Sequence, residues 1–366
     1  MATDKTRIDE WRHTRHTLRT DAATFHALRR LYGLTDPRTY LLSRPEWELP
    51  RAIPVDDLVV NVRPLEETPA ARYVAADGVL PPDALPQERY SDVVQRLAPP
   101  TLFRDQLCYR MVALSREGAT CRLDVGAMRY FEFFDQGEAM RHELAVIGDD
   151  MTRALLRRSL GDLTNLENRK VIIGVSVVTL RVESDGRATF LLHRRDRSAV
   201  ATEQDQWHVV PCGVFQPTSE DTNAWYRDAD LGALIEREIA EELLGMDEHN
   251  GNADLLRKVH AARDQGGLRL VVTGIGVNPV LGSCEILCAA VFTAHAFDET
   301  FADVVATTDE GTLLAARPGV RGFEFSDDVI EDVTTAHPFA PSGAAALWSA
   351  WRHRDELTAA NPTDDS

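Results

Sequence analysis

The pattern of apolar and polar residues changes near residue 165. Beyond this point, long apolar runs separated by polar turns predict buried strands, because runs of aliphatic and β-branched residues between turn residues are typical of them. The predicted strands are residues 171–182, 188–196, 206–217, 268–280 and 283–297. Residues 231–245 predict a helix in which Ile235, Ile239 and Leu243 form one apolar stripe that can dock on a sheet.

The first 165 residues show a more varied pattern. Residues 6–33 predict helix, whereas residues 34–100 are rich in proline and predict irregular loops with short elements. Two strands are predicted at residues 105–115 and 119–131, and a helix over residues 136–162 that breaks near Gly148.

These patterns predict an α+β protein in three parts. Residues 1–165 form an N-terminal α+β domain of unknown role, residues 166–335 form a second domain, and residues 336–366 form a C-terminal helix and tail. A chain of 366 residues is long enough for more than one domain, and the 44% of hydrophobic residues is enough for a packed core.

The net charge and the composition disfavour some binding partners and some cellular locations. The formal net charge of -18 disfavours nonspecific binding to nucleic acid and to anionic membranes. The chain has no apolar run long enough to span a bilayer and no signal-peptide core, so we expect a cytoplasmic protein of bacterial composition. The five cysteines are scattered and odd in number, which predicts reduced, mostly structural thiols.

The helix over residues 231–245 carries the strongest candidate chemistry. Residues three and four apart share a helix face, so Glu238 neighbours Glu241 and Glu242, and Arg237 can pair with Glu241. A solvated helix face is one interpretation of this pattern. The other is a site for Mg²⁺ or Mn²⁺, since converging carboxylates favour a hard divalent cation with oxygen ligands.

The residues in and around this helix resemble a known sequence signature, and this resemblance favours the metal site. The run "REIAEELLG", residues 237–245, resembles the signature of the Nudix hydrolases, and the bend at Pro211 and Gly213 resembles the segment that opens that signature. The resemblance covers roughly residues 170–335. It implies a Nudix-type α/β/α sandwich with a mixed sheet.

The resemblance also implies an activity, the hydrolysis of a nucleoside diphosphate linked to another moiety by a pyrophosphohydrolase. Glu238, Glu241 and Glu242 would hold Mg²⁺ or Mn²⁺, and Arg237 would orient one of these glutamates through a salt bridge. A water would attack phosphorus, with Glu242 or Glu285 as the candidate general base. The expected substrate contacts are Gly213, Arg194, Arg195, Phe215, Trp207 and Tyr226.

Two departures from the family pattern bear on specificity. Leu244 is an extra residue before Gly245, and the loop from Gly213 to Arg237 is longer than the family pattern, with Glu220 as the best match to its mid-loop glutamate. Two other functions stay open: a nucleotide-sensing or regulatory binding protein, and a non-hydrolytic biosynthetic enzyme on the same fold. Many Nudix proteins are dimers, so the resemblance also leaves a homodimer open. We expect a small diphosphate or nucleotide as the partner, and neither a membrane nor nucleic acid.

Overall fold

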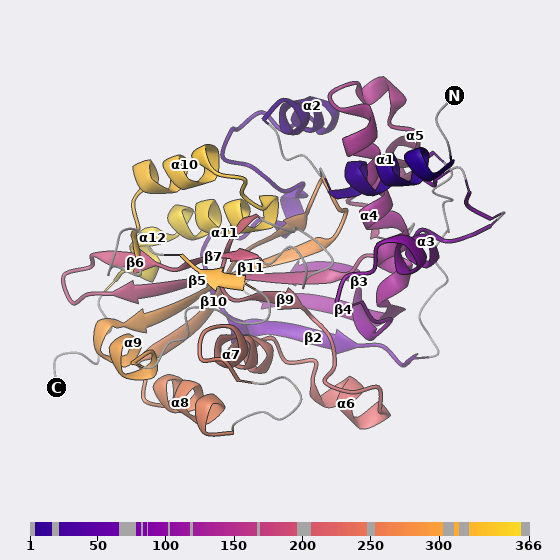
Figure 1. Cartoon of the computed structure of the whole chain (residues 1–366). Helices are drawn as coiled ribbons and strands as arrows, with labels where there is room; N and C mark the ends of the chain where they lie inside the picture. Colours follow the sequence, from indigo (N-terminus) through magenta and orange to yellow (C-terminus); the bar gives the residue numbers. More distant parts are fainter. Residues whose placement is uncertain are drawn as a thin grey trace.

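A seven-stranded mixed sheet lies at the centre of the computed structural model (Figure 1). The strand order is β1-β10-β11-β5-β6-β13, and β9 pairs with the same edge of β5 as β6 does. Only the β11–β5 pairing in this sheet is parallel. The strands are β1 (Ile53–Pro54), β5 (Ile173–Val182), β6 (Ala188–Phe190), β9 (Cys212–Val214), β10 (Leu268–Val277), β11 (Cys284–Thr293) and β13 (Phe323–Glu324).

The structure describes twelve stretches of the chain, and every statement below refers to them. They are residues 4–16, 22–65, 78–81, 83–85, 87–101, 103–117, 120–166, 169–195, 206–246, 253–302, 311–314 and 322–359.

Two of the five predicted strands divide between sheets. The run 188–196 forms β6 and then β7 (Leu192–Arg195), and the run 206–217 forms β8 (Trp207–Val209) and then β9. The strands β7 and β8 pair with each other, and β7 also pairs with β12 (Gly311–Leu313), which makes a separate three-stranded sheet. The second division falls at Val210–Pro211, a cis peptide bond between β8 and β9. An apolar run predicts burial, but it does not say which neighbour a strand pairs with.

Helices cover both faces of the central sheet (Figure 1). Alternate residues of a strand point to opposite faces. Val175 of β5 accordingly joins the apolar cluster of Ile239, whereas Val178 joins that of Leu347. One face carries α7 (Leu231–Glu242), α8 (Ala253–Asp264) and α9 (Ala294–Thr300). The other carries α10 (Asp327–Ala336), α11 (Pro341–Arg352) and α12 (Arg354–Leu357).

The N-terminal elements confirm several predictions. The predicted strand pair is present as β3 and β4, and the helix after it ends at Ile147, before Gly148 with φ 60°. The predicted helix over residues 6–33 contains helix at Asp4–His16 and at Ala22–Tyr32, and residues 17–21 lie outside the described part. The elements are α1 (Asp4–His16), α2 (Ala22–Tyr32), α3 (Tyr90–Leu97), α4 (Tyr130–Ile147), α5 (Leu155–Leu160), β2 (Leu58–Val62), β3 (Leu107–Glu117) and β4 (Thr120–Arg129). Short 3-10 helices lie at η1 (Pro45–Trp47), η2 (Val55–Asp57) and η4 (Met151–Arg153).

The predicted division at residue 165 does not separate two cores. Strand β1 pairs with β10 in the central sheet, although it comes from the N-terminal region. The backbone N–H of Met111 donates to the carbonyl of Val171, and that of Tyr109 donates to Phe215. One apolar cluster contains Tyr109 and Phe134 together with Ile173 and Ile235. The described residues of the N-terminal part therefore share an apolar cluster with the second predicted domain.

The predicted C-terminal helix corresponds to α11, which packs on the second face of the sheet. Helix α11 is buried along most of its length, from Pro341 to Ala350, against β11, β5 and β8. No helix in the described stretches is both long and apolar enough to cross a membrane. All five cysteines lie in the described residues and none is joined in a disulfide, in agreement with the prediction of reduced thiols.

Candidate functional site

Helix α7 is held in place at both ends and along one side. Its first turn is capped by the Asp230 carboxylate, which accepts from the backbone N–H of Ala233 at 3.0 Å. Ile235 and Ile239 are fully buried against the sheet. Gly245 has φ 71°, and the N–H of Met246 returns to the carbonyl of Ala240 at 3.0 Å. As predicted, Gly245 ends the helix, since glycine adopts the left-handed backbone conformation at little cost in free energy.

Two of the three predicted metal ligands form one ion-pair group with Arg237. Arg237 Nη2 lies 3.3 Å from Glu238 Oε1, and Arg237 Nε lies 3.6 Å from Glu241 Oε1. The predicted i,i+4 pair is thus present, and the same guanidinium also neutralises Glu238. The Glu238 and Glu241 side chains are 14% and 16% exposed, so both are close to the surface without being fully solvated.

Gly213 provides the space that the Glu238 carboxylate occupies. A Cβ at position 213 would lie 2.8 Å from Glu238 Oε2, closer than such atoms approach in proteins. Gly213 lies in β9 opposite Val175 of β5, so it faces α7. The sequence predicted Gly213 at the site, and the structure brings it against one of the predicted ligands.

Glu242, the third predicted ligand, has different partners. Its side chain is only 3% exposed. The Oε1 atom accepts from the backbone N–H of Cys212 at 2.8 Å, and Oε2 lies 3.3 Å from Nδ1 of His193. Glu242 is therefore fixed between β9 and β7, whereas Glu238 and Glu241 share Arg237.

Beside Glu242 lies a cluster of His193, His208 and Cys212. The two histidines are direct cross-strand partners in β7 and β8. Cys212 Sγ lies 3.5 Å from His193 Nε2, and one ligand atom from each of the three side chains lies within 4.8 Å of the other two. Among the described residues, this is the group in which three such side chains bring their ligand atoms close enough together to share one metal ion.

Sequence reasoning missed this cluster. The available signal was the spacing of His208 and Cys212 in "HVVPC" together with a histidine on the preceding predicted strand. The cysteine was interpreted as structural, because the pairing of His193 with His208 depends on a strand register that the sequence does not state.

Glu285, a candidate general base, lies apart from the α7 glutamates. Glu285 lies opposite Gly174 in the β11–β5 pairing, and a Cβ at Gly174 would lie within 3.1 Å of both carboxylate oxygens. Gly174 and Val175 are consecutive, so they point to opposite faces of β5. Glu285 is therefore on the α11 face and Glu238 on the α7 face. The Glu285 carboxylate accepts from Ser283 Oγ at 2.5 Å.

Among the predicted aromatic contacts, Phe215 is corrected to a core residue. It is fully buried, and its ring packs 4.7 Å from that of Tyr109. Trp207 is half-buried and stacks on His337 at 3.7 Å, so one of its faces is occupied. Tyr226 is 50% exposed at the end of α6 (Thr222–Arg227), within the segment predicted as a polar loop.

The predicted polar residues of the site are Arg194 and Arg195, which belong to β7, and Glu220. Arg194 is exposed on β7, opposite Trp207 in the register. The backbone of Arg195 belongs to β7, but its side chain lies outside the described part. Glu220, the expected mid-loop glutamate, pairs with Arg129 at 2.7 Å instead of with α7.

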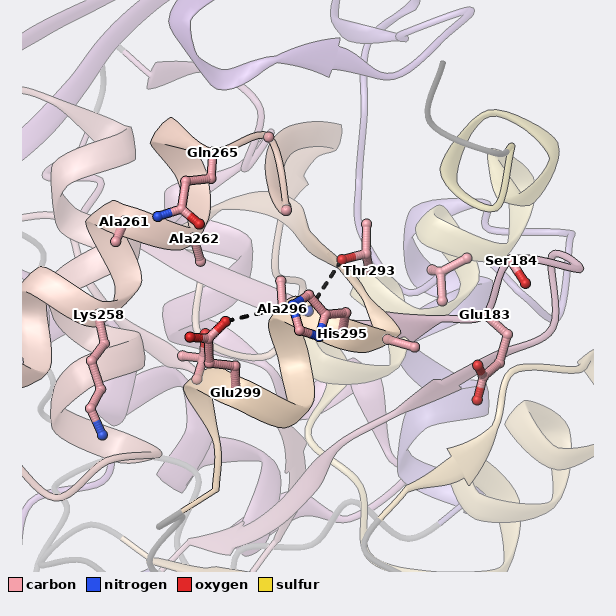
Figure 2. A pocket seen from close by; sticks show the side chains of 15 residues that line it. Glu183, Ser184, Lys258, Ala261, Ala262, Gln265, Thr293, His295, Ala296 and Glu299 are labelled. Atoms are coloured by element: carbon pink, nitrogen blue, oxygen red, sulfur yellow. Dashed lines mark hydrogen bonds and ion pairs between the residues drawn. The ribbon is translucent and has the colours of Figure 1, made fainter. Parts of the chain in front are cut away.

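A cavity of about 610 Å³ lies at the other end of β5. It opens between α8 and α9 at the carboxyl ends of the parallel strands β5 and β11, where Val182 and Thr293 line it. Figure 2 shows Lys258 of α8, Gln265 in the turn after that helix, and Glu299 of α9 around it. Val182 is seven residues from Val175 along β5, roughly 23 Å at strand spacing. This cavity is therefore separate from the acidic end of α7.

Two comparisons with known sequences gave no match. No family model matches this chain, and no curated protein matches its sequence.

Proposed function

We propose that the protein is a metal-dependent hydrolase of a nucleoside diphosphate linked to another moiety, a pyrophosphohydrolase of the Nudix type. The observation that carries the proposal is the group formed by Glu238, Glu241 and Arg237 above Gly213. Two carboxylates share one guanidinium at the rim of a sheet, beside a residue without a side chain. The resemblance of residues 237–245 to the Nudix signature supports the same function.

The donor set fits a hard divalent cation. Glu238 and Glu241 offer partly exposed carboxylate oxygens, the ligand type that Mg²⁺ and Mn²⁺ prefer, and they leave room for water and phosphate oxygens. When bound, such a cation would neutralise charge on the diphosphate and activate a water. Glu238, Glu241 and Glu242 were all expected to hold it. The contacts of Glu242 instead suit a residue that positions β9 and His193.

Arg237 has two functions in this proposal. It offsets the repulsion between Glu238 and Glu241, and it restricts the rotamers of both side chains, so that their oxygens are oriented before a cation arrives. Gly213 lets the Glu238 carboxylate approach the backbone of β9. Arg194, exposed on the neighbouring strand β7, is the candidate contact to a substrate phosphate.

The test is turnover of a panel of diphosphate compounds with Mg²⁺ and with Mn²⁺. The panel contains nucleotide sugars, dinucleotides, nucleoside triphosphates and prenyl diphosphates. Glu238→Gln and Glu241→Gln should each lower kcat by roughly 10²-fold or more, the loss typical of one electrostatic contact to the transition state. Glu331→Gln, at an exposed glutamate of α10, is the matched control and should keep wild-type turnover.

The possible outcomes distinguish the hydrolase from the binding protein and from the non-hydrolytic enzyme. Metal-dependent turnover that both α7 variants lose, and the control keeps, supports the hydrolase. Nucleotide binding without turnover, unchanged in both variants, contradicts it and favours the binding protein. Conversion of a substrate without release of phosphate or nucleotide favours the non-hydrolytic enzyme.

A further inference from the structure

We propose that His193, His208 and Cys212 form a zinc-binding site that ties the β7–β8 pair to β9. This site is separate from the Mg²⁺ or Mn²⁺ ligands proposed on α7. Imidazole nitrogen and thiolate sulfur are the donors that Zn²⁺ prefers, whereas Mg²⁺ prefers oxygen. The proposal rests on the position of three side chains from three strands, and it does not depend on the hydrolase activity.

The spacing of the ligand atoms fits a tetrahedral ion. With Zn–N and Zn–S bonds of about 2.0–2.1 and 2.3 Å, two such ligands of a tetrahedral ion lie about 3.6 Å apart. His193 Nε2 and Cys212 Sγ lie 3.5 Å apart. The ligand atom of His208 completes the group within 4.8 Å of the other two, so a small side-chain adjustment would close the site.

The other ring nitrogen of each histidine already has a partner of the kind found behind zinc ligands. His208 Nδ1 lies 2.9 Å from the carbonyl oxygen of Val209, which can only accept, so Nδ1 carries the proton and Nε2 the lone pair. His193 Nδ1 faces the Glu242 carboxylate at 3.3 Å, which leaves Nε2 for Cys212 or a metal. Metal-binding histidines almost always donate in this way to a carboxylate or a backbone carbonyl.

Charge balance at this depth favours a divalent cation. His193, His208 and Cys212 are 3%, 2% and 4% exposed, and an unbalanced charge at such depth is costly. On binding Zn²⁺ the Cys212 thiol would release its proton to solvent, and the resulting thiolate together with the Glu242 carboxylate would carry two negative charges, which match Zn²⁺. Glu242 is also held by the N–H of Cys212, so its position is linked to that of a proposed ligand.

The surrounding elements indicate what the site would do. Cys212 is opposite Ser176 of β5 in the central sheet, whereas His193 and His208 belong to the separate β7–β8 sheet. An ion bound to all three would connect the two sheets. The Ser342 hydroxyl of α11 lies 3.0 Å from His208 Nε2, so it would turn away from that nitrogen when an ion binds. A water would then supply the fourth ligand. Three protein donors with a water at the fourth position are a common zinc arrangement.

The test uses the full-length protein, stripped of metal with a chelator and then titrated with Zn²⁺ against a chromophoric competitor. We expect one tightly bound ion per chain and a rise in Tm on binding, because an ion that binds only the folded state stabilises it. Titration with Co²⁺ in place of Zn²⁺ should give a thiolate-to-cobalt charge-transfer band. Cys212→Ser should weaken Zn²⁺ binding at least tenfold and abolish that band.

Two further variants test the geometry. Glu242→Gln should weaken Zn²⁺ binding roughly 10- to 100-fold, the range typical for removing the carboxylate behind a histidine ligand. Cys121→Ser, at a buried cysteine of β4, is the matched control and should bind Zn²⁺ and Co²⁺ as wild type does.

The Co²⁺ band of the wild-type protein decides the proposal even where a variant does not fold. No bound Zn²⁺, no band, or a band that survives in folded Cys212→Ser would overturn the site. The result is independent of turnover, because Glu238→Gln and Glu241→Gln should keep Zn²⁺ binding unchanged. Loss of Mg²⁺-dependent turnover with Zn²⁺ binding intact would therefore separate the two metal sites.

Discussion

At the scale of single residues, His142 shows how burial sets protonation in this protein. It lies in α4 at 1% exposure, with Tyr90 Oη 3.0 Å from its Nδ1 and the Trp11 ring 5.3 Å away. Burial, with a smaller contribution from the positive charge of Arg15, lowers the pKa of His142 to about 3. The neutral imidazole accepts a hydrogen bond from the Tyr90 hydroxyl, so His142 does not take up a second ring proton in the folded state.

This arrangement predicts a pH dependence of stability. The unfolded chain binds a proton at His142 near pH 6.5 and the folded chain does not, so the free energy of unfolding falls as pH drops from about 6.5 towards 3. The group contributes up to about 1.4 kcal/mol per pH unit. His142→Asn keeps an acceptor for Tyr90 and does not titrate, so it should remove this part of the slope in urea unfolding between pH 7.5 and 5.

The control for this experiment is His295→Asn, at an exposed histidine of α9. It should leave the slope unchanged. Parallel pH profiles for wild type and His142→Asn would show that His142 is not the group responsible.

At the scale of elements, the position of α7 depends on its first turn. Asp230 caps the helix through the N–H of Ala233. Glu236 pairs with Arg263 of α8, and Arg263 also reaches Asp56 of η2 at 2.7 Å. These contacts hold the amino end of α7, while the glutamates proposed to bind metal lie near its carboxyl end.

We therefore expect Asp230→Ala to lower the free energy of unfolding by about 1 kcal/mol, because the backbone N–H of Ala233 loses its hydrogen-bond acceptor. Asp230→Asn keeps an oxygen acceptor and should restore most of the stability. Thermal and urea unfolding of both variants measure the difference. Equal stability of Asp230→Ala and wild type would mean that tertiary contacts alone fix this end of α7.

At the scale of the whole molecule, the described part of residues 1–165 packs directly on the central sheet. Strand β1 adds to the sheet, Leu42 forms a bridge to Val277, and Tyr109 packs on Phe215. Arg157 of α5 donates to the carbonyl of Val280 at 2.9 Å. Removing residues 1–165 would expose this shared apolar surface to water.

The resulting prediction is that residues 166–366 alone do not unfold cooperatively. The full chain should unfold in urea with coincident transitions by far-UV circular dichroism and tryptophan fluorescence, since one apolar cluster of the described residues contains side chains from both parts of the chain. Co-expression of residues 1–165 with residues 166–366 should restore a cooperative transition. A cooperative, equally stable 166–366 fragment would instead support two independent domains.

Local pattern was enough to locate most elements. The strands at β5, β10 and β11, the strand pair β3–β4, and α7 with its end at Gly245 follow from apolar spacing and from helix-terminating residues. The pairing of Arg237 with Glu241 follows from helix geometry alone, because side chains four residues apart on a helix are neighbours.

The sequence by itself determined which segments are buried and which helix carries the carboxylates, because those properties depend on nearest neighbours along the chain. The tertiary structure decided which side chains meet. The divided strands at 188–196 and 206–217, the opposite face of Glu285, the burial of Phe215 and the meeting of His193, His208 and Cys212 all depend on strand register and sheet order. A shift of one residue in register reverses the face of every side chain in a strand, and no local pattern fixes it.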